Sequence, residues 1–261
     1  MQSRLQKNRS LPYWAAGLSI AAFALFGLVA MMSKTPSLDK RGCSEAIPGK
    51  TVFVIDQSEM MALQTKTEII SRIKKLVDEK ISIGELVSVF SVTDLSKRDL
   101  KPLFSFCKPQ QTTKGPSESQ RYVTANYAKN FSKTLSAALE SPITGSQQSP
   151  IAQAIIDLSL SEYIKNPSSS RLIVFSDFLE YTERFKLYGC RDAKTAVADF
   201  RTSRGATVAR PTFSNTEIQL HIIPRAQISP SVGKCRDGFW AWFFTDNEGK
   251  TAGLDQYYLP G

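Results

Sequence analysis

The sequence predicts a three-layer α/β domain with a mainly parallel central sheet, one antiparallel edge strand and helices on both faces, preceded by one transmembrane helix. Two continuous apolar runs, TVFVID at 51–56 and RLIVFSD at 171–177, are typical of strands that are covered on both faces. Segments with apolar residues at helical spacing lie between the strand-like runs. Because strands that alternate with helices form mainly parallel sheets, these patterns indicate the α/β class.

The remaining elements follow the same alternation, with one hairpin. The polar segment between the runs at 85–92 and 100–106 is too short for a helical crossover. Pro102 cannot donate to a sheet ladder, so its strand is expected at an edge. Ser149 is expected to be a helix N-cap, with Pro150 at the first helical position. The expected strands are 51–56, 85–92, 100–106, 171–177 and 217–224, and the expected helices are 65–81, 125–140, 149–164, 192–204 and 239–249.

The N-terminal region predicts a membrane anchor. Residues 11–32 carry no charged side chain, and about 20 apolar residues suffice for a helix to cross a membrane. The preceding Arg4, Lys7 and Arg9 favour a cytoplasmic N-terminus. A cleaved signal peptide is the alternative, but its apolar region is usually shorter, and no small-residue cleavage site follows here. The expected parts are a cytoplasmic N-terminus at 1–10, a transmembrane helix at 11–32, a linker at 33–46 and a periplasmic or extracellular domain at 47–261.

The cysteines agree with export. The chain has four cysteines, all after the apolar segment and none in a C-x-x-C pair, so zinc and thioredoxin chemistry are poorly supported. An even number of well-spaced cysteines in an exported domain predicts two disulfides. The cysteines are Cys43, Cys107, Cys190 and Cys235.

Two strand-like runs end on a carboxylate. Asp56 and Asp177 stand at the carboxyl ends of their strands, which is where ligand sites of open α/β sheets lie. A right-handed crossover would bring Ser149 to the same edge, next to Ser58. Hard oxygen donors of this kind suit Mg²⁺. Asp56, Ser58, Ser149 and Asp177 are therefore the candidate metal ligands.

The ordered set VFVIDQS, SPI and LIVFSD resembles the von Willebrand factor type A domain, over about residues 47–261. FCKP at 106–109 and FWAWFF at 239–244 are similar to an exported bacterial subgroup of that family. The resemblance implies a metal-ion-dependent adhesion site, in which Asp56 and Ser58 match the first ligands, Ser149 the loop hydroxyl and Asp177 the last carboxylate. The sequence departs from the pattern at Met60, where a third hydroxyl is expected, and at Phe178, where a glycine is usual.

The site therefore has two interpretations. A thioether is a poor ligand for a hard ion, so Met60 weakens Mg²⁺ binding unless a water replaces the hydroxyl. In the alternative interpretation, Asp56 and Ser58 only satisfy the backbone of the loop, and the site is vestigial.

In the fold that the resemblance implies, Cys43 and Cys107 lie on the face opposite the metal site. Cys190 and Cys235 follow strands that end on the metal-site face. A cysteine on one of these faces is too far from a cysteine on the other for a bridge, which needs Cα atoms within about 7 Å. The resemblance therefore implies the pairs Cys43–Cys107 and Cys190–Cys235.

We do not expect an enzyme. His221 is the only histidine, and a lone histidine without a placed partner makes no catalytic triad. An Asp-nucleophile phosphotransferase of the haloacid-dehalogenase type is the main enzyme alternative, but Ser58 stands where a second Asp is needed. The aromatic cluster at 239–244 is either part of the core or a contact surface.

The sequence thus predicts an exported protein-binding module. A formal net charge of +9 suits anionic partners, but no dense basic block interleaved with aromatics is present, so nucleic acid is not expected. The expected partner is another protein of the cell envelope, bound through a Mg²⁺-bridged contact to one of its acidic residues, and the expected membrane contact is made by residues 11–32. The alternative is a structural subunit of an envelope assembly with a vestigial metal site.

Overall fold

The computed structural model describes residues 37–92, 100–113, 115, 118–142, 145–165, 169–205, 207–245 and 254–259. The unit that runs from Leu38 onward forms one compact domain. Within the described residues no helix is long and apolar enough to cross a membrane, and the predicted transmembrane segment at 11–32 lies outside them.

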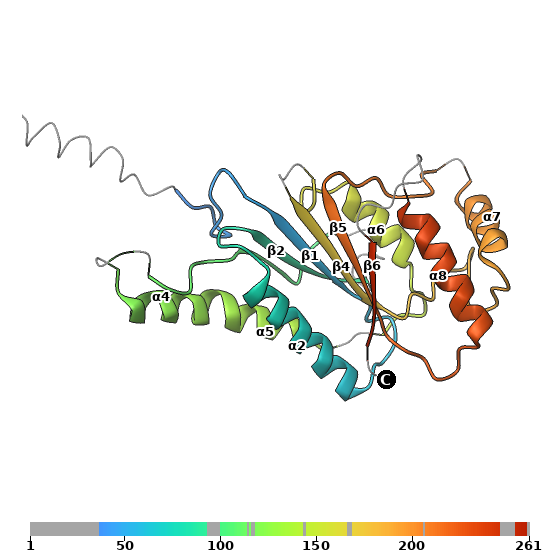
Figure 1. Ribbon diagram of the computed structural model, residues 1–261, viewed down its shortest axis with the longest axis horizontal. Helices are drawn as coiled ribbons and strands as arrows, with labels where there is room; N and C mark the ends of the chain where they lie inside the picture. The colour runs from blue at the N-terminus through green and yellow to red at the C-terminus, as the bar shows by residue number, and fades with distance from the viewer. Residues whose placement is uncertain are drawn as a thin grey trace, which may run out of the picture. The chain divides into compact units, whose positions relative to one another are not determined.

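A six-stranded sheet forms the centre of the domain, with the order β3-β2-β1-β4-β5-β6 (Figure 1). All neighbouring strands pair in parallel except β3, which runs antiparallel to β2 at the edge. The predicted α/β class and the predicted antiparallel edge strand are confirmed. The strands are β1 Lys50–Ile55, β2 Leu86–Ser91, β3 Phe104–Cys107, β4 Ser170–Ser176, β5 Thr216–Ile222 and β6 Leu254–Tyr258.

Helices cover both faces of the sheet because side chains along each buried strand point alternately to opposite sides. Val52 and Val54 of β1 belong to one core cluster, and Phe53 and Ile55 belong to another. The first core includes residues of α6, α7 and α8, and the second includes residues of α2, η1 and α5. Figure 1 shows α7 and α8 on one side of the sheet and α2 and α5 on the other. The helices are α2 Leu63–Glu79, α4 Gln120–Asn126, the π-helix η1 Tyr127–Ser132, α5 Lys133–Leu139, α6 Ile151–Ser159, α7 Ala193–Arg204 and α8 Pro230–Phe244.

The structure corrects the predicted start of α6. Ser149 makes no capping bond, and the helix begins at Ile151 after Pro150. Ser149 instead pairs with Tyr181 through two backbone hydrogen bonds, from Ser149 N to Tyr181 O (2.8 Å) and from Tyr181 N to Ser149 O (3.1 Å). This bridge holds the residue in extended backbone and turns its side chain to another partner, described below.

The last helix and the last strand also differ from the prediction. The helix α8 begins at Pro230 and ends at Phe244, instead of spanning 239–249. Ser229 provides its N-cap by accepting a hydrogen bond from Val232 N. The sequence interpretation contained no strand at the position of β6, which has a mostly exposed, polar composition. The aromatic residues at 239–244 are mainly core: Phe239, Trp240, Phe243 and Phe244 are buried.

Two disulfides are present, as predicted from the cysteine count. Cys43 is bonded to Cys107 with a Cα–Cα distance of 5.1 Å, and Cys190 to Cys235 with a distance of 6.1 Å. Cys43 is buried, and Arg41 O accepts a hydrogen bond from Cys107 N. The compact unit begins at Leu38 and includes both cysteines of this first bridge.

Lys108, directly after β3, closes the C-terminus of α2. Its buried ammonium group donates to the carbonyl oxygens of Val77 (2.7 Å), Asp78 (3.2 Å) and Ile81 (2.9 Å). Helix ends leave such carbonyls without intrahelical partners, and a cation at this end is favourable. The disulfide joins the end of β3 to the segment before β1, and Lys108 joins it to the end of α2. Both links lie at the edge of the sheet where the parallel strands begin.

Candidate functional site at the carboxyl edge of the sheet

The candidate site lies where the neighbouring strands β1 and β4 end. Asp56 follows β1 and Asp177 follows β4, and both residues are buried. The register pairs Ile55 with Phe175, and Asp56 N donates to Phe175 O at 2.8 Å. Parallel pairing therefore delivers both carboxylates to the same edge of the sheet, as the sequence predicts.

Hydroxyl and amide donors surround the carboxylate of Asp56. Oδ1 accepts from Ser58 N at 3.0 Å, and Oδ2 accepts from the hydroxyls of Ser149 (3.0 Å) and Ser176 (2.8 Å). Ser58, Ser149 and Ser176 are all buried. Such bonds hold the carboxylate in one position.

Asp177 is fixed by a backbone amide and by an arginine. Oδ1 accepts from Leu179 N at 2.9 Å, and Oδ2 accepts from Arg225 Nε at 2.7 Å. Burial raises the pKa of Asp177, and the nearby Asp56 raises this pKa further, whereas the bonds from Leu179 and Arg225 lower it. The arginine therefore opposes the effect of burial on the pKa of this carboxyl group.

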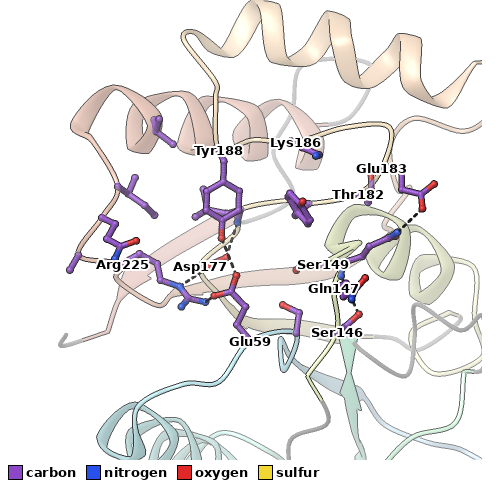
Figure 2. Close-up of a pocket in the computed structure, with 18 of the residues that line it drawn as sticks. Glu59, Ser146, Gln147, Ser149, Asp177, Thr182, Glu183, Lys186, Tyr188 and Arg225 are labelled. Atoms are coloured by element: carbon purple, nitrogen blue, oxygen red, sulfur yellow. Dashed lines mark hydrogen bonds and ion pairs between the residues drawn. The ribbon is translucent and has the colours of Figure 1, made fainter.

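Arg225 also bridges to a second, more exposed carboxylate. Its Nη2 lies 2.9 Å from Glu59 Oε2, and the Tyr188 hydroxyl donates to Glu59 Oε1 at 3.2 Å (Figure 2). Burial raises the pKa of Tyr188 to about 12, with further contributions from Asp177 and Glu59. A chain of opposite charges thus runs from Asp177 through Arg225 to Glu59.

A fourth carboxyl group, that of Glu180, is buried near Asp56. Its Oε2 accepts from Ala152 N at 2.8 Å, at the first turn of α6. Complete burial raises the pKa of Glu180 to about 8, although the bonds from the helix amides lower it. Glu180 therefore provides the helix with the N-terminal cap that the sequence assigned to Ser149.

The loop between β4 and Glu180 has an unusual backbone. Phe178 has φ 58, in the left-handed region where glycine is favoured. Phe178 N donates to Ser176 Oγ at 2.8 Å, and Phe178 O accepts from Trp240 Nε1 at 2.7 Å. Arg236 Nη1 donates to Asp177 O at 3.2 Å. The helix α8 thus holds in place a loop that, in the family pattern, contains a glycine at this position.

A cleft of about 1170 Å³ opens over this edge of the sheet. Glu59, Asp177 and Arg225 also line a smaller pocket of about 240 Å³. The bridge therefore borders two cavities at the same edge of the sheet. Further lining residues of the large cleft include Gln148, Tyr181, Glu183, Lys186, Tyr188 and Gln227.

The structure brings together all the predicted ligand residues, but in this arrangement they do not fit a Mg²⁺ ion. Arg225 already provides Asp177 with a positive charge, which would repel a divalent cation. Met60, at the position of the expected hydroxyl, has 87% of its surface exposed. Within the described residues, no group of three or more His, Cys, Asp and Glu side chains is placed to hold a metal ion.

Sequence reasoning did not identify Ser176, Tyr188 and Arg225 as site residues. Arg225 carried a usable signal, because it stands just beyond the end of β5, next to β4 in the sheet. Ser176 directly precedes Asp177, at the end of a strand already assigned to the site. Tyr188 carried no such signal, because it lies in an irregular segment between β4 and α7.

Solved structures with some similarity to this chain include three proteins. The first is the ArnB paralog VWA2 from Sulfolobus acidocaldarius, with 13% identity, a TM-score of 0.45, and coverage of 82% of this chain and 41% of that one. The second is an aerotolerance-related membrane protein from Bacteroides fragilis, with 13% identity, a TM-score of 0.36, and coverage of 81% and 91%. The third is a variant of the PilB minor pilin from Streptococcus sanguinis, with 11% identity, a TM-score of 0.35, and coverage of 81% and 57%.

This chain thus spans about two fifths of the length of the archaeal protein, 41%. The sequence matches no family model, and no curated protein matches it.

Proposed function

We propose that this chain is a membrane-anchored, exported protein-interaction module of the von Willebrand factor A type. It binds a protein of the cell envelope in the cleft at the carboxyl edge of the sheet. The observation that carries this proposal is the cleft itself, which opens directly onto the Asp177–Arg225–Glu59 bridge. Charged groups that line an open cleft favour recognition of a partner with complementary charge.

The cleft wall supports binding of a protein surface. Tyr181 and Tyr188 are partly exposed, and their rings meet edge to face with 6.0 Å between the ring centres. Lys186 Nζ lies 4.7 Å from the centre of the Tyr181 ring. Exposed tyrosine side chains of this kind are common anchors of protein interfaces.

The proposal does not include catalysis. His221 does not line the cleft, and it is stacked in the sheet between Phe175 and Tyr257. The bonds to Asp56 and Asp177 from neighbouring hydroxyls, amides and Arg225 hold these carboxylates as fixed structural groups. These contacts favour recognition over an Asp-nucleophile reaction.

The magnesium-bridged contact remains the finer version of the proposal. In that version Asp56, Ser58, Ser149 and Asp177 would hold the ion, and Arg225 would first have to leave Asp177. The competing class is a structural subunit of an envelope assembly, and the internal satisfaction of Asp56 by Ser58, Ser149 and Ser176 favours it.

A pull-down from native membranes with the full chain tests the module. Lys186→Glu reverses an exposed charge in the cleft, and Lys75→Glu makes the same change on the exposed face of α2. We expect Lys186→Glu to reduce recovery of the partner and Lys75→Glu to retain it. Equal recovery with both variants would show that the cleft is not the binding surface.

Reporter fusions test the proposed membrane topology. A reporter fused after Gly261 should be active only if it is a type that works outside the cytoplasm. Activity of a cytoplasm-only reporter at the same position would contradict both the anchor orientation and the exported location of the domain.

A further inference from the structure

We propose that Arg225 is the cation that receives the partner's acidic side chain, and that Glu59 is an internal carboxylate that occupies this position until the partner binds. This inference rests on the proposed function and names the chemistry of the contact. It differs from the metal-bridged version because the positive charge belongs to the chain itself.

The two carboxylates that hold Arg225 have different surroundings. The side chain of Asp177 is 6% exposed, whereas that of Glu59 is 50% exposed. Asp177 is further anchored by Leu179 N at its carboxylate and by Arg236 at its backbone carbonyl. Asp177 is therefore the fixed anchor of the guanidinium, and Glu59 is the partner that can be replaced.

Replacement of Glu59 costs little. Ion pairs between solvent-exposed side chains contribute only weakly to stability. Glu59 lies in the loop between β1 and α2, and Arg225 and Tyr188, which both contact its carboxylate, also line the large cleft. A carboxylate that enters through the cleft can therefore take the same two donors.

The donors fit a carboxylate. A planar guanidinium presents parallel N–H groups that match the two oxygens of a carboxylate. The Tyr188 hydroxyl donates to the same group from the other side, as Glu59 already demonstrates (Figure 2). The wall residue Lys186 adds positive charge to the same cleft. We therefore assign the ligand as an Asp or Glu side chain of a partner protein.

NMR titration of the full chain in detergent micelles tests the inference, with the Nε–H resonance of Arg225 as the readout. The probe is a capped tripeptide with a central Asp, its control is the same peptide with Asn, and a metal chelator is present throughout. We expect the Asp peptide to shift the resonance and the Asn peptide to leave it unchanged. In Glu59→Gln the apparent affinity should rise by about two- to fivefold, the factor of a lost exposed ion pair.

Two outcomes would overturn the inference: an unchanged resonance with the Asp peptide, or equal affinity in the wild type and Glu59→Gln. A neutral residue at position 225 would leave Asp177 buried without its counter-charge. The variant Arg225→Lys keeps the positive charge but removes the planar pair of N–H donors. It should fold and bind the peptide more weakly.

The native-membrane pull-down separates this inference from the proposed function. A partner that Lys186→Glu loses and Arg225→Lys fully retains would preserve the binding module and reject the role of Arg225. A partner that neither variant loses would reject the cleft as the binding surface.

Discussion

The hydroxyl of Ser149 donates a 3.0 Å hydrogen bond to Oδ2 of Asp56, and so joins the segment before α6 to the end of β1. Both residues are buried, and the same carboxylate oxygen accepts a second hydrogen bond, from the hydroxyl of Ser176. The contact is thus part of the fold as well as of the candidate site.

Ser149→Ala should therefore lower the free energy of unfolding by about 1–2 kcal/mol, because it removes a buried hydrogen bond and leaves a buried acceptor with one donor fewer. Ser71→Ala on the exposed face of α2 is the control and should change stability by less than about 0.5 kcal/mol. Denaturant unfolding measures both. Equal stability of Ser149→Ala and the wild type would show that the bond makes no net contribution to the free energy of unfolding.

Much of this site was predictable because strand ends are local features of the sequence. The runs before Asp56 and Asp177 mark where β1 and β4 stop, and parallel pairing then fixes the edge at which both carboxylates lie. The role of Ser149 was not predictable in full. A serine before Pro-Ile has the composition of a helix start, and only the pairing with Tyr181 turns its hydroxyl away from the helix.

Two elements near the C-terminus show a different limit of the sequence. The segment 230–238, the first part of α8, lacks a clear apolar period, so the aromatic run alone defined the predicted helix. The strand β6 has mostly exposed side chains without a strand-like apolar pattern, so its sequence does not predict a strand. Backbone pairing with β5 forms it. In β6, tertiary pairing overrides the local pattern.

Magnesium binding is expected to depend on Arg225. Arg225→Gln should strengthen binding because it removes the positive charge that Asp177 now holds. Met60→Ser should also strengthen it by adding a hard hydroxyl ligand, whereas Asp177→Ala should abolish any Mg²⁺-dependent stabilisation. Isothermal titration with Mg²⁺ and Mn²⁺ measures these effects.

Leu63→Ser, at an exposed position just beyond the loop, is the control for Met60→Ser and should leave Mg²⁺ affinity unchanged. If the wild type does not bind Mg²⁺ and neither Arg225→Gln nor Met60→Ser gains binding, the metal site is vestigial. Tight binding by the wild type would show that the ion displaces Arg225 from Asp177.

His221 should make the domain sensitive to mild acid. Its buried Nδ1 has no hydrogen-bond partner in the part of the chain that the structure describes. Burial, with a smaller contribution from Arg72, lowers the pKa of His221 to about 4. The unfolded chain takes up a proton near pH 6.5, the ordinary His pKa, and the folded chain does so only near pH 4. Stability from this residue is therefore full above pH 6.5 and is lost as the pH falls towards 4, by up to about 3 kcal/mol.

His221→Phe is the matched variant, because a phenyl ring can keep the stacking against Phe175 and Tyr257. Unfolding free energies of the wild type and the variant between pH 4 and pH 7 give the contribution of His221 as a difference. The raised pKa of Glu180 acts in the opposite direction, since its contribution declines as pH rises, and it cancels in this difference. A pH-independent difference would contradict a neutral buried histidine.

Gly238 of α8 lies close to the first residue of α7. A Cβ at position 238 would lie 2.7 Å from the Cβ of Ala193, the first residue of α7. The disulfide between Cys190 and Cys235 limits how far the two segments can separate there. Gly238→Ala should therefore destabilise the domain by about 1–3 kcal/mol, because overpacking outweighs the better helix propensity of alanine.

The same helix contains the control. A Cβ at position 233 would have no atom of the described residues within 4 Å, so Gly233→Ala should stabilise the domain by about 0.5–1 kcal/mol through helix propensity alone. The double variant Ala193→Gly with Gly238→Ala removes one of the two clashing methyl groups, and it should recover part of the stability that Gly238→Ala loses. Thermal and denaturant unfolding of the single and double variants gives the coupling between positions 193 and 238. If Gly238→Ala is as stable as Gly233→Ala, or if Ala193→Gly rescues nothing, the two helices do not meet at this point.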